Sequence, residues 1–311
     1  MTELTVIAHP DCAVHDPQPG HPEQPARIRA VMEGLDQLDE LRRLTASVAD
    51  RGQLLRAHRG RYIDRLLELE NDLGPDAPSM PLDPDTHVGH GSVRAARLAA
   101  GAACQAVDET TAGQRPTFAV IRPPGHHATA DRAMGFCLLN SIAVAAEHAL
   151  NTTNVRRVAI CDFDVHHGNG TEEIVAGRRE ILFVSSHQLP LYPGSGDPGH
   201  GSAPNIHNVA LPPGSGSDQF REAWKGKLLD RIERFGPDLI LVSAGFDGHW
   251  RDPLAQLQLK DEDFFWIGHQ LKVLADSHAD GRLAASLEGG YDLRALTESA
   301  LAFAEGITFT H

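Results

Sequence analysis

The feature that most constrains the fold is a series of short apolar runs separated by stretches of helical periodicity. Each run is nearly continuously apolar, which is typical of strands buried on both faces of a parallel sheet. The alternation of strands and helices predicts an α/β fold with a mainly parallel sheet. The predicted strands are Leu4–His9, Thr117–Arg122, Val158–Asp162, Ile181–Ser186, Leu239–Ser243 and Leu283–Leu287.

Apolar stripes at helical spacing lie within residues 95–106, 220–235 and 264–274. A length of 311 residues would allow two domains. No linker, repeat or charge block divides the chain, so we expect one domain over residues 1–311. The Pro/Gly-rich stretches 74–91 and 190–216 are predicted to be long ordered loops, which are often functional.

Charge and cysteine content limit the classes of partner. Lys and Arg together number 28 against 42 Asp and Glu, a net charge of −14, which disfavours nucleic acid as a partner. No apolar run reaches 18 residues, and the N-terminus lacks the pattern of a signal peptide. We therefore expect a soluble cytoplasmic protein with reduced cysteines and no membrane contact. No sequence feature indicates the oligomeric state.

Polar clusters follow almost every predicted strand. Ligands of open parallel sheets bind outside the carboxyl ends of the strands. We therefore expect these clusters to form one site at that edge of the sheet. The clusters occupy residues 8–10, 122–127, 162–170, 185–187, 247 and 288–291.

The cluster after the third predicted strand has the composition of a metal site. Asp162, Asp164 and His166 alternate, so an extended backbone projects them to one side. Asp164 and His166, with Asp247 from a neighbouring strand, would suit Zn²⁺, Fe²⁺ or Mn²⁺ and leave coordination positions open. No cysteine occupies these positions, which argues against a closed structural zinc site. The alternative is an ordinary turn in which Asp and His cap backbone groups.

Two further motifs carry candidate catalytic groups. His126 and His127 follow a stiff Pro-Pro-Gly turn, where one imidazole can act as a general base and the other electrostatically. They could instead be further metal ligands or lie on an exposed turn. Tyr291 follows two glycines, so its hydroxyl can turn back to stabilise an oxyanion. Its alternative is a core tyrosine at a strand end.

These motifs, in this order and spacing, resemble those of the histone deacetylase superfamily, in particular its class II type and bacterial deacetylase and amidohydrolase relatives. The resemblance extends from about residue 9 to the C-terminal helix. It implies an arginase-like fold, with a parallel sheet of about eight strands between helices. The matching segments are GHPEQPAR, RPPGHH, MGFC, DFDVHHGNG, VSSH, YPGSGD, SAGFD and EGGYD.

The resemblance also implies a reaction, which is hydrolysis of an amide by a zinc ion. Asp164, His166 and Asp247 would hold the zinc. The zinc would hold the attacking water, and together with Tyr291 it would polarise the amide carbonyl. His127 would be the general base and would later protonate the leaving amine.

Supporting roles follow from the same resemblance. His126 would assist electrostatically, with Asp162 as its carboxylate partner. Asn169 would face His127; a neutral amide raises the pKa of that histidine less than a carboxylate would. A structural K⁺ would lie behind the zinc. The residues implied to hold it are Asp162, Ser185 and carbonyl groups near Asp164 and His166.

The substrate channel is implied by the resemblance as well. Phe136, with Gly135, and Tyr192 would flank the acyl-lysine stem, and Asp85 would grip the substrate backbone at the rim. Leu254 stands where the family's polyamine deacetylase carries a glutamate, which disfavours a polyamine specialist. The bulky polar segment 249–251 departs from the pattern of most eukaryotic relatives.

Three functions remain open at this point. The first is zinc-dependent deacylation of an acylated amine, above all acetyl-lysine in a peptide or protein. The second is deacylation of a small amide resembling an acetylpolyamine. The third is a non-catalytic module that binds acyl-lysine or metal, and the presence of the full set of metal-binding and catalytic residues disfavours it.

Overall fold

A computed structural model describes residues 2–198 and 203–310. Eight strands form one sheet in the order β2-β1-β5-β10-β9-β6-β7-β8, and every neighbouring pair is parallel. The α/β fold with a parallel sheet is therefore confirmed. The strands of the sheet are β1 (Leu4–Ala8), β2 (Leu41–Thr45), β5 (Thr117–Ala119), β6 (Val158–Asp162), β7 (Ile181–Gln188), β8 (Ile206–Leu211), β9 (Leu239–Ala244) and β10 (Leu283–Leu287).

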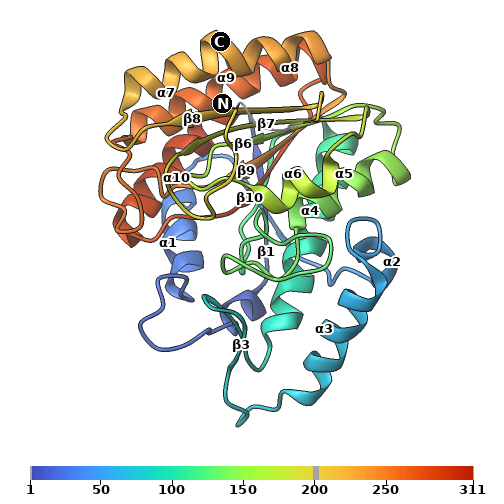
Figure 1. Ribbon diagram of the computed structural model, residues 1–311. Coiled ribbons are helices and arrows are strands. Elements are labelled where there is room, and N and C mark those ends of the chain that lie inside the picture. Colours follow the sequence, from blue (N-terminus) through green and yellow to red (C-terminus); the bar gives the residue numbers. More distant parts are fainter. Residues whose placement is uncertain (1, 199–202, 311) are drawn as a thin grey trace.

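Helices cover both faces of the sheet, and a short antiparallel hairpin lies apart from it (Figure 1). The hairpin consists of β3 (Met80–Asp83) and β4 (Thr86–Val88). The longer helices are α1 (Ala26–Leu35), α3 (Gly60–Asp72), α4 (Ser92–Gly113), α5 (Ser141–Thr152), α9 (Asp261–His278) and α10 (Leu293–Thr308). The shorter ones are η1 (Pro10–Ala13), α2 (Arg51–Leu54), α6 (Asn169–Val175), α7 (Ser217–Ala223), the π-helix η2 (Trp224–Leu228) and α8 (Leu229–Phe235). No helix within the described ranges has the length and apolar character needed to cross a bilayer.

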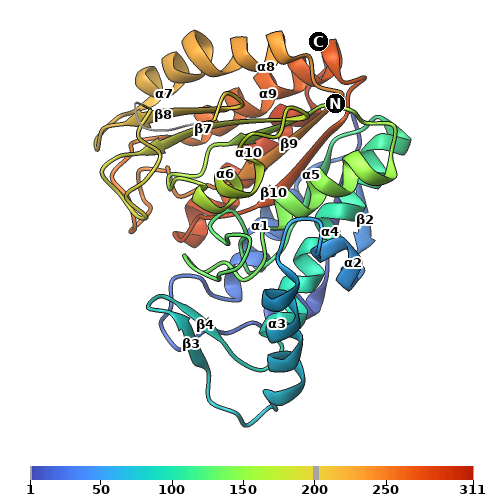
Figure 2. The same cartoon turned by 45° about the vertical axis from the view of Figure 1, so that its right-hand side comes forward.

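Alternate side chains of each strand enter two separate apolar layers. In β6, Ala159 and Cys161 pack into the layer that includes residues of α1 and α7–α10. Val158 and Ile160 face the opposite way, into the layer formed with α4 and α5. Figure 2 shows α3 and the β3–β4 hairpin projecting beyond this three-layer body. Burial of both faces is the reason that the inner strands are continuously apolar.

Two strands of the sheet were not predicted, and both lie at its edges. β2 has the sequence LRRLT, in which Arg42 and Arg43 are exposed, so it lacks a continuous apolar run. β8 lies inside the stretch 190–216 that was predicted to be a loop, and the β3–β4 hairpin lies inside 74–91. The predicted strand Thr117–Arg122 was too long, since β5 ends at Ala119. Edge strands are paired on one side only, so their sequences are freer to be polar.

The stripe predicted over residues 220–235 is helical and mostly buried, with Phe235 only partly so, and one segment of it is a π-helix. Phe220, Trp224, Leu228 and Ile232 recur every four residues and are all buried. A period of four exceeds the 3.6 residues of an α-helical turn, so a regular α-helix would rotate this stripe away from the sheet. The wider π-helical turn at 224–228 compensates for the difference.

A buried histidine from the segment between α2 and α3 anchors the loop that follows β5. His58 donates from Nδ1 to the Thr129 carbonyl oxygen at 3.0 Å, and its Nε2 accepts the Asn140 N–H at 2.9 Å. The second contact requires the neutral imidazole, because a protonated ring has no lone pair on Nε2. Burial lowers the pKa of His58 from 6.5 to about 4.

We expect His58 to make the protein acid-sensitive. As the pH falls below 6.5, the unfolded chain takes up a proton that the folded chain does not accept until about pH 4. One pKa unit corresponds to about 1.4 kcal/mol, so the folded state loses about 3 kcal/mol of stability over this range. The His58→Gln variant should be less stable at pH 7.5 but lose less stability towards pH 4.5, as measured by urea unfolding. Parallel losses in the two proteins would contradict this role.

Candidate active site

The candidate catalytic residues gather at the carboxyl edge of the sheet, although they come from four separate loops. The loop after β6 supplies Asp164 and His166, and the loop after β9 supplies Asp247. The loop after β5 carries the adjacent histidines 126–127, called the tandem histidines below, and the loop after β10 carries Tyr291. Because all eight strands are parallel, these loops leave the sheet on the same side.

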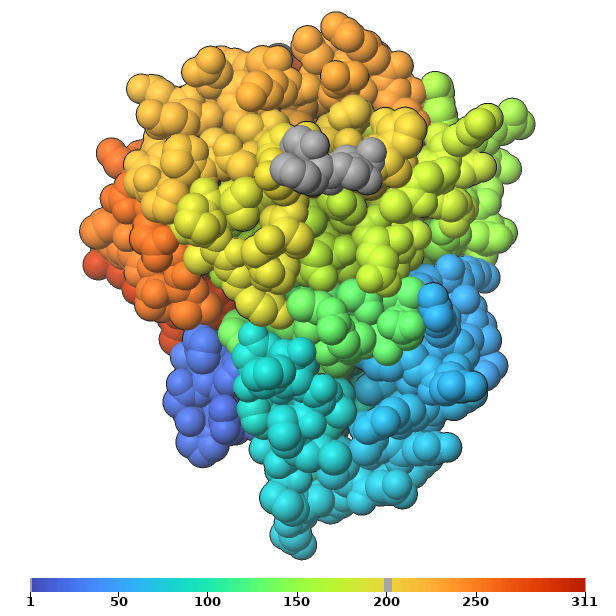
Figure 3. Space-filling model, viewed as in Figure 1, coloured from blue at the N-terminus to red at the C-terminus, as the bar shows by residue number. Residues whose placement is uncertain are grey.

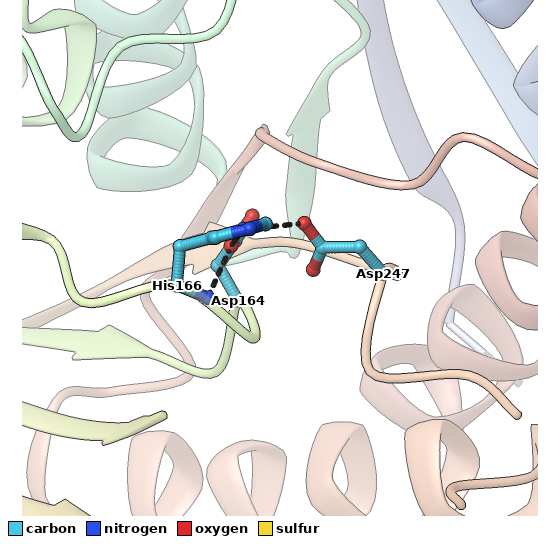
Figure 4. A group of neighbouring side chains, drawn as sticks. All are labelled: Asp164, His166 and Asp247. Atoms are coloured by element: carbon cyan, nitrogen blue, oxygen red, sulfur yellow. Dashed lines mark hydrogen bonds and ion pairs between the residues drawn. The ribbon is translucent and has the colours of Figure 1, made fainter. Parts of the chain in front are cut away.

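Asp164, His166 and Asp247 form one buried group whose candidate ligand atoms lie within 4.8 Å of one another. Figure 4 shows the His166 ring beside Asp164 and directed toward the Asp247 carboxylate. Nδ1 of His166 lies 3.1 Å from Asp164 Oδ1 and 3.0 Å from Asp247 Oδ2. Two carboxylates and one imidazole suit zinc or a similar divalent cation. Two buried carboxylates are costly without positive charge, so the residues present fit a metal ion.

Backbone N–H groups fix the remaining oxygen atoms of this group. Asp164 Oδ2 accepts the Gly289 N–H at 2.8 Å, and Asp247 Oδ1 accepts the Val165 N–H at 2.9 Å. Residue 289 must be glycine, because a Cβ there would lie 2.1 Å from Asp247 Oδ2. Burial lowers the pKa of His166, but its hydrogen bonds to the two aspartates outweigh this and raise it to about 10. The position therefore strongly attracts positive charge.

The tandem histidines have opposite electrostatic environments, although their rings are only 4.1 Å apart. His126 Nδ1 donates to Asp162 Oδ2 at 3.0 Å. Burial opposes its charge, but Asp164 and Asp162 raise its pKa to about 10. His127 Nδ1 donates to Asn169 Oδ1 at 2.8 Å, and burial, with the charges of the neighbouring histidines, holds its pKa well below the usual value. Neighbouring groups whose pKa values are pushed apart are suited to divide the acid and base roles.

Tyr291 is buried beside the rim of the site. Its ring lies 5.8 Å from that of Phe136, and the Arg27 guanidinium lies 4.9 Å from its centroid. Its backbone N–H donates to Asp252 Oδ2 at 2.7 Å. Burial raises the pKa of the phenol well above its usual value, so the hydroxyl stays protonated and able to donate a hydrogen bond.

The predicted channel residues lie around this centre. The Tyr192 ring is 5.2 Å from that of His127 and is 37% exposed, so the site reaches the surface beside it. Gly135 donates its N–H to Asp85 Oδ1 at 3.2 Å, and the adjacent Phe136 contacts Tyr291. In Figure 3, surface from the segments near residues 85, 135 and 190 meets on one face.

Leu254 and Ser185 are connected to the site through neighbouring residues. The Leu254 N–H donates to Asp252 Oδ1 at 3.0 Å, which connects this residue to the Tyr291 loop through one carboxylate. Ser185 is buried and pairs in register with Asp162 across β6 and β7. In the segment 249–251, Trp250 is half exposed.

Sequence reasoning missed two buried carboxylates that bind the catalytic loops. Asp252 holds the backbone of Tyr291, and Glu288 accepts the N–H groups of Gly125 and His126. The available signal for Glu288 was its place directly after an apolar strand, whereas Asp252 lies well beyond the end of β9. For both, the sequence does not show which N–H groups the carboxylate accepts.

Comparisons with known proteins agree with this geometry. A family model described as the histone deacetylase domain matches residues 21–307. The chain is 40% identical to the histone deacetylase-like amidohydrolase of Pseudomonas aeruginosa over 88% of this chain and 73% of that protein. It is 38% identical to a probable deacetylase of Methanothermobacter thermautotrophicus over 98% of this chain and 90% of that one. The solved HDA15 HD domain has a TM-score of 0.89 and 31% identity, covering 99% of this chain and 90% of that chain.

The fold and site thus define a deacetylase domain built on an eight-stranded parallel sheet. The chain belongs to the histone deacetylase family, which confirms the resemblance drawn from its motifs. Membership supports hydrolysis of an acylated amine as the class of reaction.

Proposed function

We propose that the protein is a zinc-dependent deacylase that hydrolyses the amide of an acylated amine, above all acetyl-lysine. The observation that carries this proposal is the buried Asp164–His166–Asp247 group beside two adjacent histidines, one hydrogen-bonded to a carboxylate and the other to a neutral amide. Residues 1–311 would act as one catalytic unit, since strands from both halves of the chain build the one sheet.

The metal-binding residues would be Asp164, His166 and Asp247. When bound, a zinc ion supplies a Lewis acid that polarises an amide carbonyl and lowers the pKa of water. A structural K⁺ is a further part of the proposal, with Asp162 and Ser185 among its ligands. Support for it is the burial of both residues side by side on adjacent strands.

His127 is suited to move the proton in this reaction. Its Nδ1–H is engaged by Asn169 Oδ1, which leaves the lone pair on Nε2. Nε2 would take a proton from the attacking water and then transfer it to the nitrogen of the leaving amine. His126, kept charged by Asp162, would stabilise negative charge as it develops, and the Tyr291 hydroxyl would donate to the oxyanion.

Substrate choice would depend on the rim. Phe136 and Tyr192 would flank the substrate stem, and Asp85 would bind its backbone. Leu254 cannot pair with a second amine, which favours acyl-lysine over a long polyamine. A small amide remains the second candidate, because Asp83 and Asp85 lie together at this rim and would attract a cationic amine.

Acetate release from an acetyl-lysine peptide and from acetylputrescine, measured side by side, tests the proposal. We expect turnover that a chelator abolishes and added zinc restores. We also expect kcat/KM to be at least about tenfold higher for the peptide, because a few additional substrate contacts provide a preference of that size. A preference for acetylputrescine would favour the second candidate. Release from neither substrate would contradict deacetylation.

A further inference from the structure

Glu288 joins the ends of three strands at the candidate active site. It directly follows β10 and is completely buried. Its Oε2 accepts the N–H of Gly125 at 2.6 Å and that of His126 at 3.1 Å, both in the loop after β5. Its Oε1 accepts the hydroxyl of Ser243, near the end of β9, at 3.4 Å.

The two N–H groups that Glu288 accepts belong to the turn that carries the tandem histidines. A carboxylate that accepts two backbone N–H groups fixes the peptide planes of a turn more firmly than a neutral acceptor would. The position of His126, and with it that of His127, therefore depends on where this carboxylate lies.

The same residue begins the loop that carries Tyr291. Arg27 donates from Nε to the Gly290 carbonyl at 2.7 Å and from Nη2 to the carbonyl of Glu288 itself. The backbone of Glu288 is thus tied to the tyrosine loop while its side chain is tied to the histidine turn.

We propose that Glu288 is a positioning residue for the hydrolysis, whose carboxylate sets the separation between the tandem histidines and Tyr291. This inference rests on the proposed function, because it assigns the same site a further residue. A residue needed only for packing at this depth would be apolar, since burying a carboxylate is costly without donors. Burial indeed raises the pKa of Glu288 to about 7, against the opposing effect of His126 and the two N–H donors.

Two substitutions separate positioning from general stability. Glu288→Ala leaves both N–H groups without their acceptor. Because a small misplacement of catalytic groups has a large effect on rate, we expect kcat to fall about 100-fold. KM should change less than about threefold. Glu288→Gln keeps the shape and one acceptor oxygen, and should retain at least about tenfold more activity than the alanine variant. Equal kcat values for wild type and Glu288→Ala would overturn the inference.

Asp263→Asn is the matched control. Asp263 is also a fully buried carboxylate, but it accepts the Ser217 hydroxyl at 2.6 Å and the Lys260 N–H at 3.1 Å, in α7 and beside α9. We expect this variant to lose stability in urea unfolding while kcat stays within about twofold of wild type. An equal fall of kcat in this control and in Glu288→Ala would mean that stability alone explains the loss, and the inference would fail.

A readout that needs no substrate completes the experiment. With ¹⁵N-labelled glycine and histidine, the amide protons of Gly125 and His126 should resonate downfield in the wild type and move upfield in both Glu288 variants, because charge-assisted hydrogen bonds are the shorter ones. Unchanged shifts in Glu288→Ala would overturn the inference whether or not the protein is a deacylase. Inactive wild-type protein would show instead that the proposed function fails.

Discussion

Asp164→Ala should abolish metal binding and hydrolysis together. The substitution removes one of three candidate ligands and leaves His166 facing Asp247 alone. It also removes the acceptor of the Gly289 N–H. Since a metal ion contributes several kcal/mol to such a reaction, kcat should fall by at least about 10³-fold. Metal content by atomic emission and acetate release on the same preparation check both effects.

Asp164→Asn separates the effect of the negative charge of this side chain from the effect of its size and its hydrogen bond. The asparagine keeps an oxygen for the Gly289 N–H but not the negative charge, so the fold should persist while metal affinity falls. We expect its free energy of unfolding, measured under chelation, to be closer to that of the wild type than that of Asp164→Ala. An Asp164→Ala protein that retained one equivalent of metal and full turnover would remove this residue from the proposed ligands.

The sequence was sufficient for the inner part of the sheet because burial on both faces leaves a continuous apolar signature. β6, β9 and β10 are buried along their whole length, and their apolar runs marked them. The same signature fails at the edges, where β2 presents arginines to solvent. Pairing across a sheet is a long-range property, so an edge strand is not marked by its own residues.

The site could be predicted as a set of residue types but not as a network. The sequence shows three residues of the types that bind metal ions, and the parallel strands bring them together: Asp164, His166 and Asp247. Glu288 and Asp252 act through backbone N–H groups 163 and 39 residues away along the chain, which have no signature in the sequence. Their partners are known only once the loops are folded against one another.

Tyr291→Phe should leave the metal in place and remove most of the turnover. The ring remains, with its contacts to Phe136 and Arg27, and only the hydroxyl is lost. Because burial holds the pKa of the phenol well above its usual value, the wild-type hydroxyl donates throughout the working pH range. Loss of one oxyanion donor costs about 10²–10³ in kcat, so we expect a decrease of that size with little change in KM.

Tyr62→Phe is the matched control, since Tyr62 is a second tyrosine whose hydroxyl makes a defined bond. It donates to the Leu138 carbonyl at 2.6 Å, and the substitution should lower stability by about 1 kcal/mol without a comparable loss of kcat. If Tyr291→Phe kept both its metal and normal turnover, the hydroxyl would have no part in catalysis. If it lost its metal as well, Tyr291 would act by holding the metal group together, because its loop also supplies the N–H of Gly289 to Asp164.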